Sequence, residues 1–385
     1  MKNFEVKTKI FFGSNSLDRL KHLKYSNLMI ITDPFVVSSG LIKQVTSRLD
    51  EVGTKYTVYD DVIPDPPVDK VISGVTTALQ INPECIVAIG GGSAMDLSKS
   101  IRKFAQRIKP DFQPKLVAVP TTSGTGSEVT PFSVITDPEA GTKYPLASND
   151  MVPDEAILDE ELVKSVPPSI TADTGMDVMT HALEAYVSIN NNEFSAALAE
   201  KAVEICGQFL IRSYNDNNDA HARRKMHIAS CLAGLAFSSA SLGLNHGMAH
   251  QLGAQFHIPH GRANAMLLPH IIEYNSKITK NSRSRKEYDA CVRKYCNIAR
   301  ILGVYNLNEI TTIQALKSYM RFMCTEMNIP LSISEIGGIS EGEYMSRIDT
   351  MAEAALRDGT TATNPRTPTK EDIIKIYENL WQIRY

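Results

Sequence analysis

The sequence predicts a chain of two parts, an α/β half followed by an all-α half. Over about the first 165 residues, short runs rich in Val, Ile and Ala alternate with segments of helical periodicity, which is the pattern of a parallel sheet covered on both faces. After the pair Pro167–Pro168 the helical periodicity continues, and no convincing strand follows. The length of 385 residues suits two domains, which we expect at 1–168 and 169–385.

The elements of the α/β half follow in order from these runs. The N-terminal stretch MKNFEVKTKIFFG alternates polar and apolar residues like a strand. Further strands are predicted at 28–32, 55–62, 85–90 and 115–120, with one helix after the first of them to about residue 52 and another over 68–80.

The all-α half is predicted from long stretches of helical periodicity, of which the clearest are DVMTHALEAYVS, AALAEKAVEICGQFLIRSY and RRKMHIASCLAGLAFSSA. A last helix is expected within 361–381. Thr369 is positioned to cap it, and Asp372 to support its first turn.

The composition excludes several classes of protein. Hydrophobic residues make up 43% of the chain and charged residues 22%, which is ordinary for a globular protein. The net charge of −3 with dispersed Lys and Arg argues against nucleic-acid binding, and no apolar run approaches the roughly 18 residues of a membrane helix. No export signal is visible and the six cysteines form no CxxC pair, so we expect a cytoplasmic chain with reduced, mostly buried cysteines.

Two glycine-containing loops directly follow predicted strands. In CIVAIGGGSAMD, the glycines let the backbone approach a ligand, Ser93 is positioned to cap the next helix, and the helix N-terminus favours an anion. A tight strand–helix turn is the alternative. The second loop, VPTTSGTGSEVT, supplies hydroxyl groups and flexible backbone. Because both loops would lie at carboxyl ends of parallel strands, together they indicate a dinucleotide rather than a lone phosphate.

Asp33 follows the strand LMIIT and is placed to accept a hydrogen bond from a ribose hydroxyl. A carboxylate there would repel a 2′-phosphate and so favour NAD over NADP. The alternative, a simple turn aspartate before Pro34, is equally compatible with the sequence.

Histidines are concentrated in one segment, GLNHGMAHQLGAQFHIPHG, which holds His246, His250, His257 and His260. His246 and His250 are four residues apart and would share one face of a helix. Imidazole is the commonest metal ligand in proteins and the usual acid–base group near neutral pH, although a lone histidine is usually structural.

A carboxylate completes the candidate metal site. Asp177 and His181 are also four residues apart, at the start of a predicted helix. One carboxylate with three imidazoles suits Fe²⁺ or Zn²⁺ with positions left open for a substrate oxygen. Glu184 lies three residues after His181 and is expected either to support a ligand or to be structural.

These stretches resemble the iron-containing, group III alcohol dehydrogenases. The matching motifs span nearly the whole chain, and within the family the likeness is greatest to propanol dehydrogenases of propanediol-degrading bacteria. The resemblance implies a Rossmann-like domain and a helical domain in a dehydroquinate synthase-like architecture, with cofactor and metal in the cleft between them. The motifs are GGGSAMD, PTTSGTGSEVT, ITADTGMDVMTHALEAYVS, GLNHGMAHQLGAQFHIPHG and TNPR.

The resemblance also implies roles for individual residues. It places the metal ligands at Asp177, His181, His246 and His260. His250 would lie beside the nicotinamide and the substrate, whereas His257 receives no role and is expected to be a loop or surface residue. The cofactor positions carry over as Asp33, Gly91, Gly92, Ser93, Thr121, Thr122 and Lys143, to which the loop composition adds Thr125.

Three positions that differ from one member of the family bear on the substrate and the cofactor. A lactaldehyde-reducing member has asparagine where Phe132 and Asp65 stand here, and cysteine at the position of Thr360. We expect Phe132, Phe237 and Thr360 to shape the pocket, and an apolar Phe132 to favour a short alkyl chain over a hydroxylated substrate. Asp65, which stands where that member has asparagine, is expected to contact the cofactor.

The sequence thus predicts a metal-dependent, NAD(H)-linked alcohol dehydrogenase that interconverts a propanal-like aldehyde and its primary alcohol, with Fe²⁺ favoured over Zn²⁺. A reductase of a charged aldehyde such as sulfoacetaldehyde, or a lactaldehyde- or glycerol-type dehydrogenase, is the alternative. Dehydroquinate synthase-type lyases share the architecture but need several Lys and Arg residues that the histidine-rich segment lacks, and a metal-storage protein would not need the two glycine loops. We expect a homodimer or higher homo-oligomer, cytoplasmic or inside a bacterial microcompartment.

Overall fold

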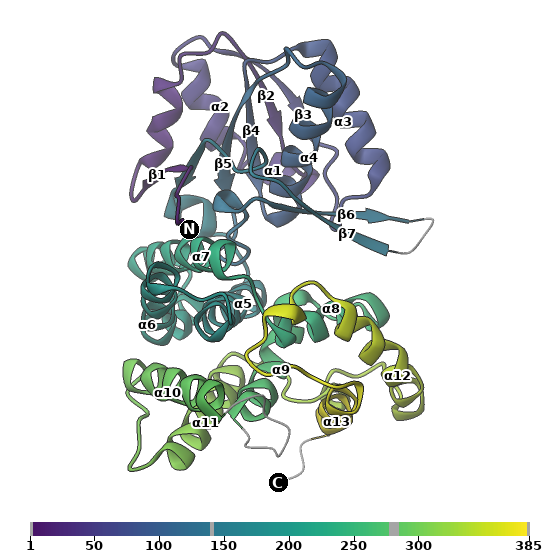
Figure 1. Ribbon diagram of the computed structural model, residues 1–385. Helices are drawn as coiled ribbons and strands as arrows, with labels where there is room; N and C mark the ends of the chain where they lie inside the picture. Colours follow the sequence, from purple (N-terminus) through teal and green to yellow (C-terminus); the bar gives the residue numbers. More distant parts are fainter. Residues whose placement is uncertain (1–2, 139–141, 277–284, 383–385) are drawn as a thin grey trace. The chain divides into compact units, whose positions relative to one another are not determined.

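The computed structural model describes residues 3–138, 142–276 and 285–382, which form two compact units (Figure 1). The first unit covers residues 1–166 and the second covers residues 167–385. The division therefore falls beside the Pro167–Pro168 pair, close to the boundary expected at 168.

A six-stranded parallel sheet forms the centre of the first unit, in the order β1-β8-β5-β4-β2-β3. The chain leaves β2 toward β3 and then returns to the other side of β2 with β4, so the strand order reverses between β2 and β4. In open α/β sheets, ligands bind at the carboxyl ends of the strands beside such a reversal. The strands are β1 (Lys9–Phe12), β2 (Asn27–Ile31), β3 (Lys55–Tyr59), β4 (Cys85–Gly90), β5 (Lys115–Pro120) and β8 (Glu155–Leu158).

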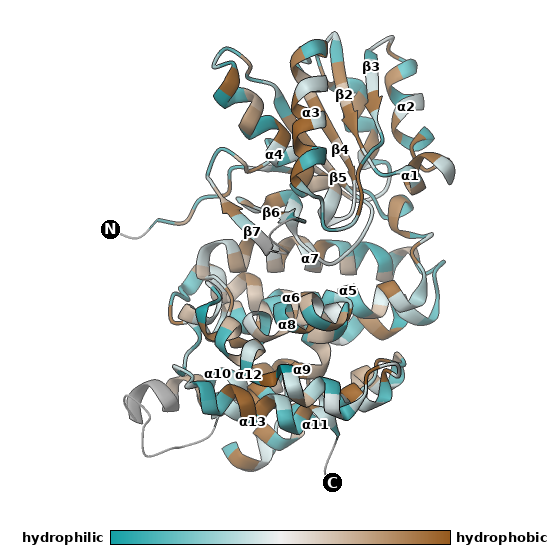
Figure 2. Ribbon diagram, turned by 90° about the vertical axis from the view of Figure 1, so that its right-hand side faces the viewer, coloured by the Kyte–Doolittle hydropathy of each residue, from teal (hydrophilic) through white to brown (hydrophobic). Residues whose placement is uncertain are grey.

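Helices cover both faces of this sheet, because successive residues of a strand point to opposite sides. Met29 and Ile31 pack with α3 and α4, whereas Leu28 and Ile30 pack with α2 and the neighbouring 3₁₀ segments. Figure 2 shows β2 and β4 as hydrophobic strands between more polar helices. The helical segments of this unit are η1 (Ser16–His22), α1 (Pro34–Ser38), α2 (Lys43–Asp50), α3 (Val68–Ile81), α4 (Gly92–Ile108), η2 (Ser127–Val129) and η3 (Glu160–Val163).

Several local predictions for the first unit were wrong. The single helix expected up to residue 52 is two helices, α1 and α2, with Gly40 at positive φ between them. Ser93 does not cap α4, since Gly91 holds the N-cap position and no side chain caps that end. The antiparallel hairpin of β6 (Phe132–Asp137) and β7 (Thr142–Ala147) was not predicted, nor was β8.

The second unit contains helices joined by loops and, among its described residues, no strand. Helices α5, α6 and α7 pack against one another, and α9 contacts α5, α8 and α11. A hydrophobic core joins α8, α9, α12 and α13. The helices are α5 (Pro168–Val187), α6 (Glu193–Asn215), α7 (Ala220–Ala240), α8 (Leu244–Phe256), α9 (His260–Ser276), α10 (Arg285–Ile301), α11 (Glu309–Glu326), α12 (Glu341–Arg357) and α13 (Lys370–Trp381), with short 3₁₀ turns η4 (Ile333–Glu335) and η5 (Thr361–Thr363).

Two predictions outside the site were correct. Thr369 caps α13, and the Asp372 side chain completes the capping box. All six cysteines are buried and none forms a disulfide. Across the described residues, no single helix is long and apolar enough to span a membrane, while the sharply bent pair α7 and α8 meets that test by length and composition alone.

Candidate metal centre and dinucleotide loops

Helix α5 supplies the first two predicted metal ligands. Asp177 and His181 are one turn apart and buried, and the His181 Nε2 atom lies 3.9 Å from Asp177 Oδ2. The apolar residues of α5 are buried on every side of the helix, so these two polar groups are held inside the unit rather than on a solvated face.

Helix α8 supplies the third predicted ligand, His246, which is 1% exposed. A Cβ at Gly243, just before the helix, would lie only 2.7 Å from Glu184 Oε1. The absence of a side chain at this position therefore lets the start of α8 approach the Glu184 carboxylate on α5.

Helix α9 begins at His260, the fourth predicted ligand. A Cβ at Gly261 would lie 2.0 Å from the carbonyl oxygen of Asp173, so only glycine allows this close crossing of α9 over α5. The crossing places His260 Nε2 3.6 Å from Asp177 Oδ1.

The four predicted ligands thus converge from three helices. One ligand atom of each residue lies within 4.8 Å of those of the others. The Nε2 atoms of His246 and His260 are both 3.6 Å from Asp177 Oδ1. Asp177, His181 and His246 are buried, whereas the His260 side chain is 43% exposed, which leaves the cluster open on one side.

Glu184 fixes the direction in which His246 presents its lone pair. The carboxylate Oε2 lies 2.5 Å from His246 Nδ1, and Oε1 accepts a hydrogen bond from the Asn245 amide at 2.7 Å. Because Nδ1 faces Glu184, Nε2 is the ring nitrogen that faces Asp177, and it can bind a metal ion once it has lost its proton. Burial alone would lower the pKa of His246, but Glu184 and Asp177 raise this pKa to about 9.

The surroundings of Asp177 favour its ionised form although the side chain is buried. Burial would raise its pKa, but the facing histidines hold the pKa well below its usual range. The donor set of one carboxylate oxygen and three imidazole nitrogens suits Fe²⁺ or Zn²⁺, so these residues fit an iron ion.

His250 lies beside this cluster without joining it. Its ring stacks on His260 at a centroid distance of 5.4 Å, and its Nδ1 lies 2.8 Å from Asp358 Oδ2. Asp358 Oδ1 accepts hydrogen bonds from the Thr360 amide at 2.9 Å and the Thr360 hydroxyl at 2.7 Å. Burial would raise the Asp358 pKa, but these partners hold the pKa far below its usual range.

Sequence reasoning missed two residues of this region. Asn264 Nδ2 lies 2.8 Å from Asp177 Oδ1 and 3.1 Å from Nε2 of both His246 and His260. Its position four residues after His260 on one helix face was the available signal. Asp358 had no such signal, because it lies 108 residues after His250.

His257 ends α8 as an exposed residue at φ 54°, outside the cluster. The predicted pocket residue Phe237 stacks on His181, with ring centroids 4.6 Å apart, and forms an apolar wall beside the metal ligands. Thr360 is tied to Asp358 as described above. Phe132 belongs to the first unit, where it begins β6 and its carbonyl accepts a hydrogen bond from Lys99.

In the first unit, the two predicted dinucleotide loops lie against each other. They follow the neighbouring strands β4 and β5, and the Thr121 amide donates to the Gly90 carbonyl at 2.9 Å. A Cβ at Gly92 would lie 2.9 Å from Thr125 Cγ2, and one at Gly91 would lie 3.5 Å from Thr122 Oγ1. Ser93 is in the first turn of α4.

Asp33 lies at the same edge of the sheet, after β2. Its Oδ1 accepts a hydrogen bond from the Val36 amide at 2.9 Å, so Asp33 is the N-cap of α1. Its Oδ2 points toward Gly90, where an added Cβ would be 3.3 Å away. One oxygen is therefore used in the turn, as the alternative interpretation expected, while the other faces the glycine loop.

The remaining two cofactor candidates, Asp65 and Lys143, lie outside the two glycine-containing loops. Asp65 lies before α3 at φ 50°, a left-handed conformation that asparagine and aspartate adopt more readily than most residues. Lys143 lies in β7 opposite Thr136, and its side chain is outside the described residues.

A buried lysine, not predicted from the sequence, supports the second loop. Lys99 Nζ on α4 donates to Ser127 Oγ at 2.6 Å and to Thr130 Oγ1 at 3.2 Å. Ser127 in turn donates to Asp96 Oδ1 at 2.7 Å. Burial lowers the pKa of Lys99 to about 8 and raises the pKa of the neighbouring Glu128 to about 7.

This fold, with a carboxylate and three histidines gathered in its helical unit, defines a metal-dependent dehydrogenase class. The family description "Iron-containing alcohol dehydrogenase" matches residues 7–160, and "Fe-containing alcohol dehydrogenase family, C-terminal" matches residues 171–381. The chain belongs to the iron-containing alcohol dehydrogenase family and is an oxidoreductase.

Relatives and solved structures are similar over the full length. The 1-propanol dehydrogenase of Citrobacter freundii is 42% identical over 99% of this chain and 100% of its own. The NADPH-dependent butanol dehydrogenase of Clostridium saccharobutylicum is 38% identical, over 98% and 97% respectively. A 1,3-propanediol oxidoreductase structure superposes with a TM-score of 0.89 at 30% identity, covering 99% of this chain and 100% of that one.

Proposed function

We propose that this alcohol dehydrogenase reduces short unbranched aldehydes such as propanal with NADH, and oxidises the corresponding primary alcohols in reverse. The observation that carries the proposal is the convergence of Asp177, His181, His246 and His260 on one point. In this proposal residues 167–385 hold the metal, and residues 1–166 bind the dinucleotide through the two glycine-containing loops.

Asp177, His181, His246 and His260 would hold the iron ion, which would supply Lewis-acid chemistry toward the substrate oxygen. The chain's own residues prepare the site for it. Glu184 orients His246, and the exposed His260 side leaves room for a substrate oxygen. His250 is the candidate group for holding or relaying the substrate proton, because Asp358 fixes its Nδ1 and leaves Nε2 for the substrate.

The surroundings of the cluster favour an alkyl substrate. Phe237 is an apolar ring against His181, and the Thr360 hydroxyl is already engaged by Asp358. Arg262, the cation closest in sequence to His260, is paired with Asp173 at 3.1 Å and is not available for a sulfonate. The 42% identical relative from Citrobacter freundii is a 1-propanol dehydrogenase, which agrees with this choice.

A panel of short aldehydes tests the substrate. Enzyme loaded with Fe²⁺, and separately with Zn²⁺, is given NADH or NADPH, and loss of the reduced nicotinamide absorbance is followed. We expect kcat/KM for propanal and butanal to exceed that for lactaldehyde or sulfoacetaldehyde by at least about tenfold, as for a pocket that discriminates apolar from polar groups. Faster turnover of sulfoacetaldehyde would overturn the assignment.

The metal ligands have their own test. His260→Ala should no longer bind stoichiometric iron, which elemental analysis measures. The control is His257→Ala, which removes a nearby histidine outside the cluster and should keep its iron. The homo-oligomeric state and the cytoplasmic or microcompartment location remain predictions, which sedimentation and cell fractionation can check.

A further inference from the structure

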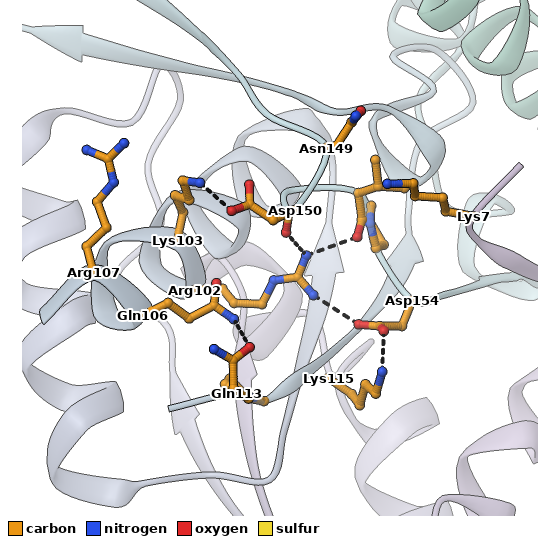
Figure 3. A pocket seen from close by; sticks show the side chains of 13 residues that line it. Lys7, Arg102, Lys103, Gln106, Arg107, Gln113, Lys115, Asn149, Asp150 and Asp154 are labelled. Atoms are coloured by element: carbon orange, nitrogen blue, oxygen red, sulfur yellow. Dashed lines mark hydrogen bonds and ion pairs between the residues drawn. The ribbon is translucent and has the colours of Figure 1, made fainter. Parts of the chain in front are cut away.

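The first unit contains a cavity of about 650 Å³ (Figure 3). It lies where β5 begins, at the opposite end of that strand from the dinucleotide loops. It is lined by the second half of α4 and by the segments that lead into β5 and β8. Lys115 on its wall is the first residue of β5, whereas Thr121 of the dinucleotide loop follows the last residue of the same strand. The cavity is therefore separate from the proposed cofactor site.

Positive charge dominates the cavity wall, although the whole chain has a net charge of −3. Five cationic side chains and two carboxylates line it, an excess of three positive charges. The cations are Lys7, Arg102, Lys103, Arg107 and Lys115, and the carboxylates are Asp150 and Asp154.

A buried arginine makes the wall a fixed structure. The Arg102 side chain is only 6% exposed and donates to Asp154 Oδ2 at 2.9 Å and to the Val152 carbonyl at 2.9 Å. Asp154 also accepts from Lys115 at 2.8 Å and from the Leu116 amide at 2.9 Å. One carboxylate thus serves two cations and cannot neutralise both.

Two other cations lack strong partners among the described residues. Arg107 forms no ion pair or hydrogen bond with the described residues, and Lys7 reaches only the exposed Glu5, at 4.0 Å. In Figure 3, Arg107 and Lys103 lie on the left of the cavity, and Lys7 and Lys115 on the right. The positive charge is thus divided between two sides of one concave space.

We propose that this cavity binds a small metabolite that carries two phosphate groups, one toward each pair of cations. Its volume is within the roughly 300–1,000 Å³ of small-molecule sites. Arginine and lysine are the side chains that bind phosphate, and charge-assisted hydrogen bonds to it are about twice as strong as neutral ones. A concave site on an acidic protein is unlike the extended basic surface that a nucleic acid requires.

Fructose 1,6-bisphosphate is a suitable probe, titrated calorimetrically into zinc-loaded enzyme at low salt with saturating NAD⁺ to occupy the proposed cofactor loops. We expect one site per chain with a Kd below about 1 mM, which corresponds to about 4 kcal/mol of binding free energy. The double variant Lys7→Gln/Arg107→Gln should weaken binding by at least about tenfold, since it removes one cation from each side.

Matched controls make the result decisive. Lys43→Gln/Lys375→Gln removes the same charge from exposed positions on α2 and α13 and should change the Kd by less than about twofold. Fructose 6-phosphate, with one phosphate, should bind at least about tenfold more weakly than the bisphosphate. The proposal fails if no binding is detected, if both double variants weaken binding equally, or if the two sugar phosphates bind equally well.

Discussion

The Nδ1 atom of His250 lies 2.8 Å from Oδ2 of Asp358, and the other oxygen of that carboxylate is occupied by two donors from Thr360. Asp358 is therefore held by its own turn and acts on His250 from a fixed position. The carboxylate accepts a hydrogen bond from Nδ1–H, which keeps the ring proton on Nδ1 and leaves Nε2 free to accept a hydrogen bond.

The first prediction reverses this tautomer. In Asp358→Asn the amide oxygen should keep the Thr360 hydrogen bonds, so the NH₂ group faces Nδ1 and forces the ring proton onto Nε2. We expect kcat/KM for propanal to fall about 10²-fold, the lower end of the range for general acid–base groups, with iron content unchanged. Steady-state kinetics and the ring ¹⁵N resonances of His250 check this. Unaltered turnover with a shifted ring proton would contradict the role of His250; the exposed Asp349→Asn is the control.

The second prediction concerns Glu184 and the metal. Glu184→Gln places an amide donor against His246 Nδ1, so the Nε2 lone pair that faces Asp177 is lost. Metal affinity should fall about 10- to 100-fold, as for other groups that orient metal-bound histidines. Competition with a zinc chelator measures this, with Glu193→Gln at the exposed start of α6 as the control. Equal affinity in both variants would show that Glu184 does not orient the ligand.

The third prediction separates the two roles of Asp33. Asp33→Ser keeps an N-cap side chain for α1 but removes the carboxylate oxygen beside Gly90. If that oxygen excludes a 2′-phosphate, the ratio of kcat/KM for NADPH over NADH should rise by at least about tenfold. Asp33→Ala removes both cap and charge and should shift the ratio equally while lowering stability by about 1 kcal/mol. An unchanged ratio in both variants would exclude Asp33 from cofactor choice.

The fourth prediction is a pH dependence of stability from His270 on α9. Burial, together with Arg321 and Lys317, lowers its pKa to about 4 from the ordinary 6.5, against the opposing effect of Glu273. Between these values the unfolded chain binds a proton that the folded chain does not, so this contribution to stability is lost as the pH falls from about 6.5 toward 4.

The corresponding variant is His270→Gln. As the pH falls over that range, the free energy of unfolding of the wild type should decrease by roughly 1–3 kcal/mol relative to that of His270→Gln. One pKa unit is equivalent to about 1.4 kcal/mol. Urea unfolding of both proteins at several pH values measures the difference. His22→Gln, which removes an exposed imidazole, should show no such slope. Parallel curves for wild type and His270→Gln would remove His270 as the cause.

The sequence by itself determined the two-part fold and five of the six strands of the central sheet, all but β8. The apolar runs at 85–90 and 115–120 coincide with β4 and β5, because strands buried on both faces leave an unbroken hydrophobic signal. The pairs Asp177–His181 and His246–His250 were also visible, since a spacing of four residues places two side chains on one helix face without reference to the rest of the chain.

Only the tertiary structure decided which groups meet. Glycine at 261 allows α9 to cross α5 and brings His260 to Asp177, and the turn after α12 brings Asp358 to His250 across 108 residues. The β6–β7 hairpin, the 3₁₀ segments and the buried Lys99 likewise depend on neighbours distant in sequence. Local periodicity encodes which side of an element is buried, whereas the packing of whole helices sets the distances between their side chains, and no short stretch of sequence contains that information.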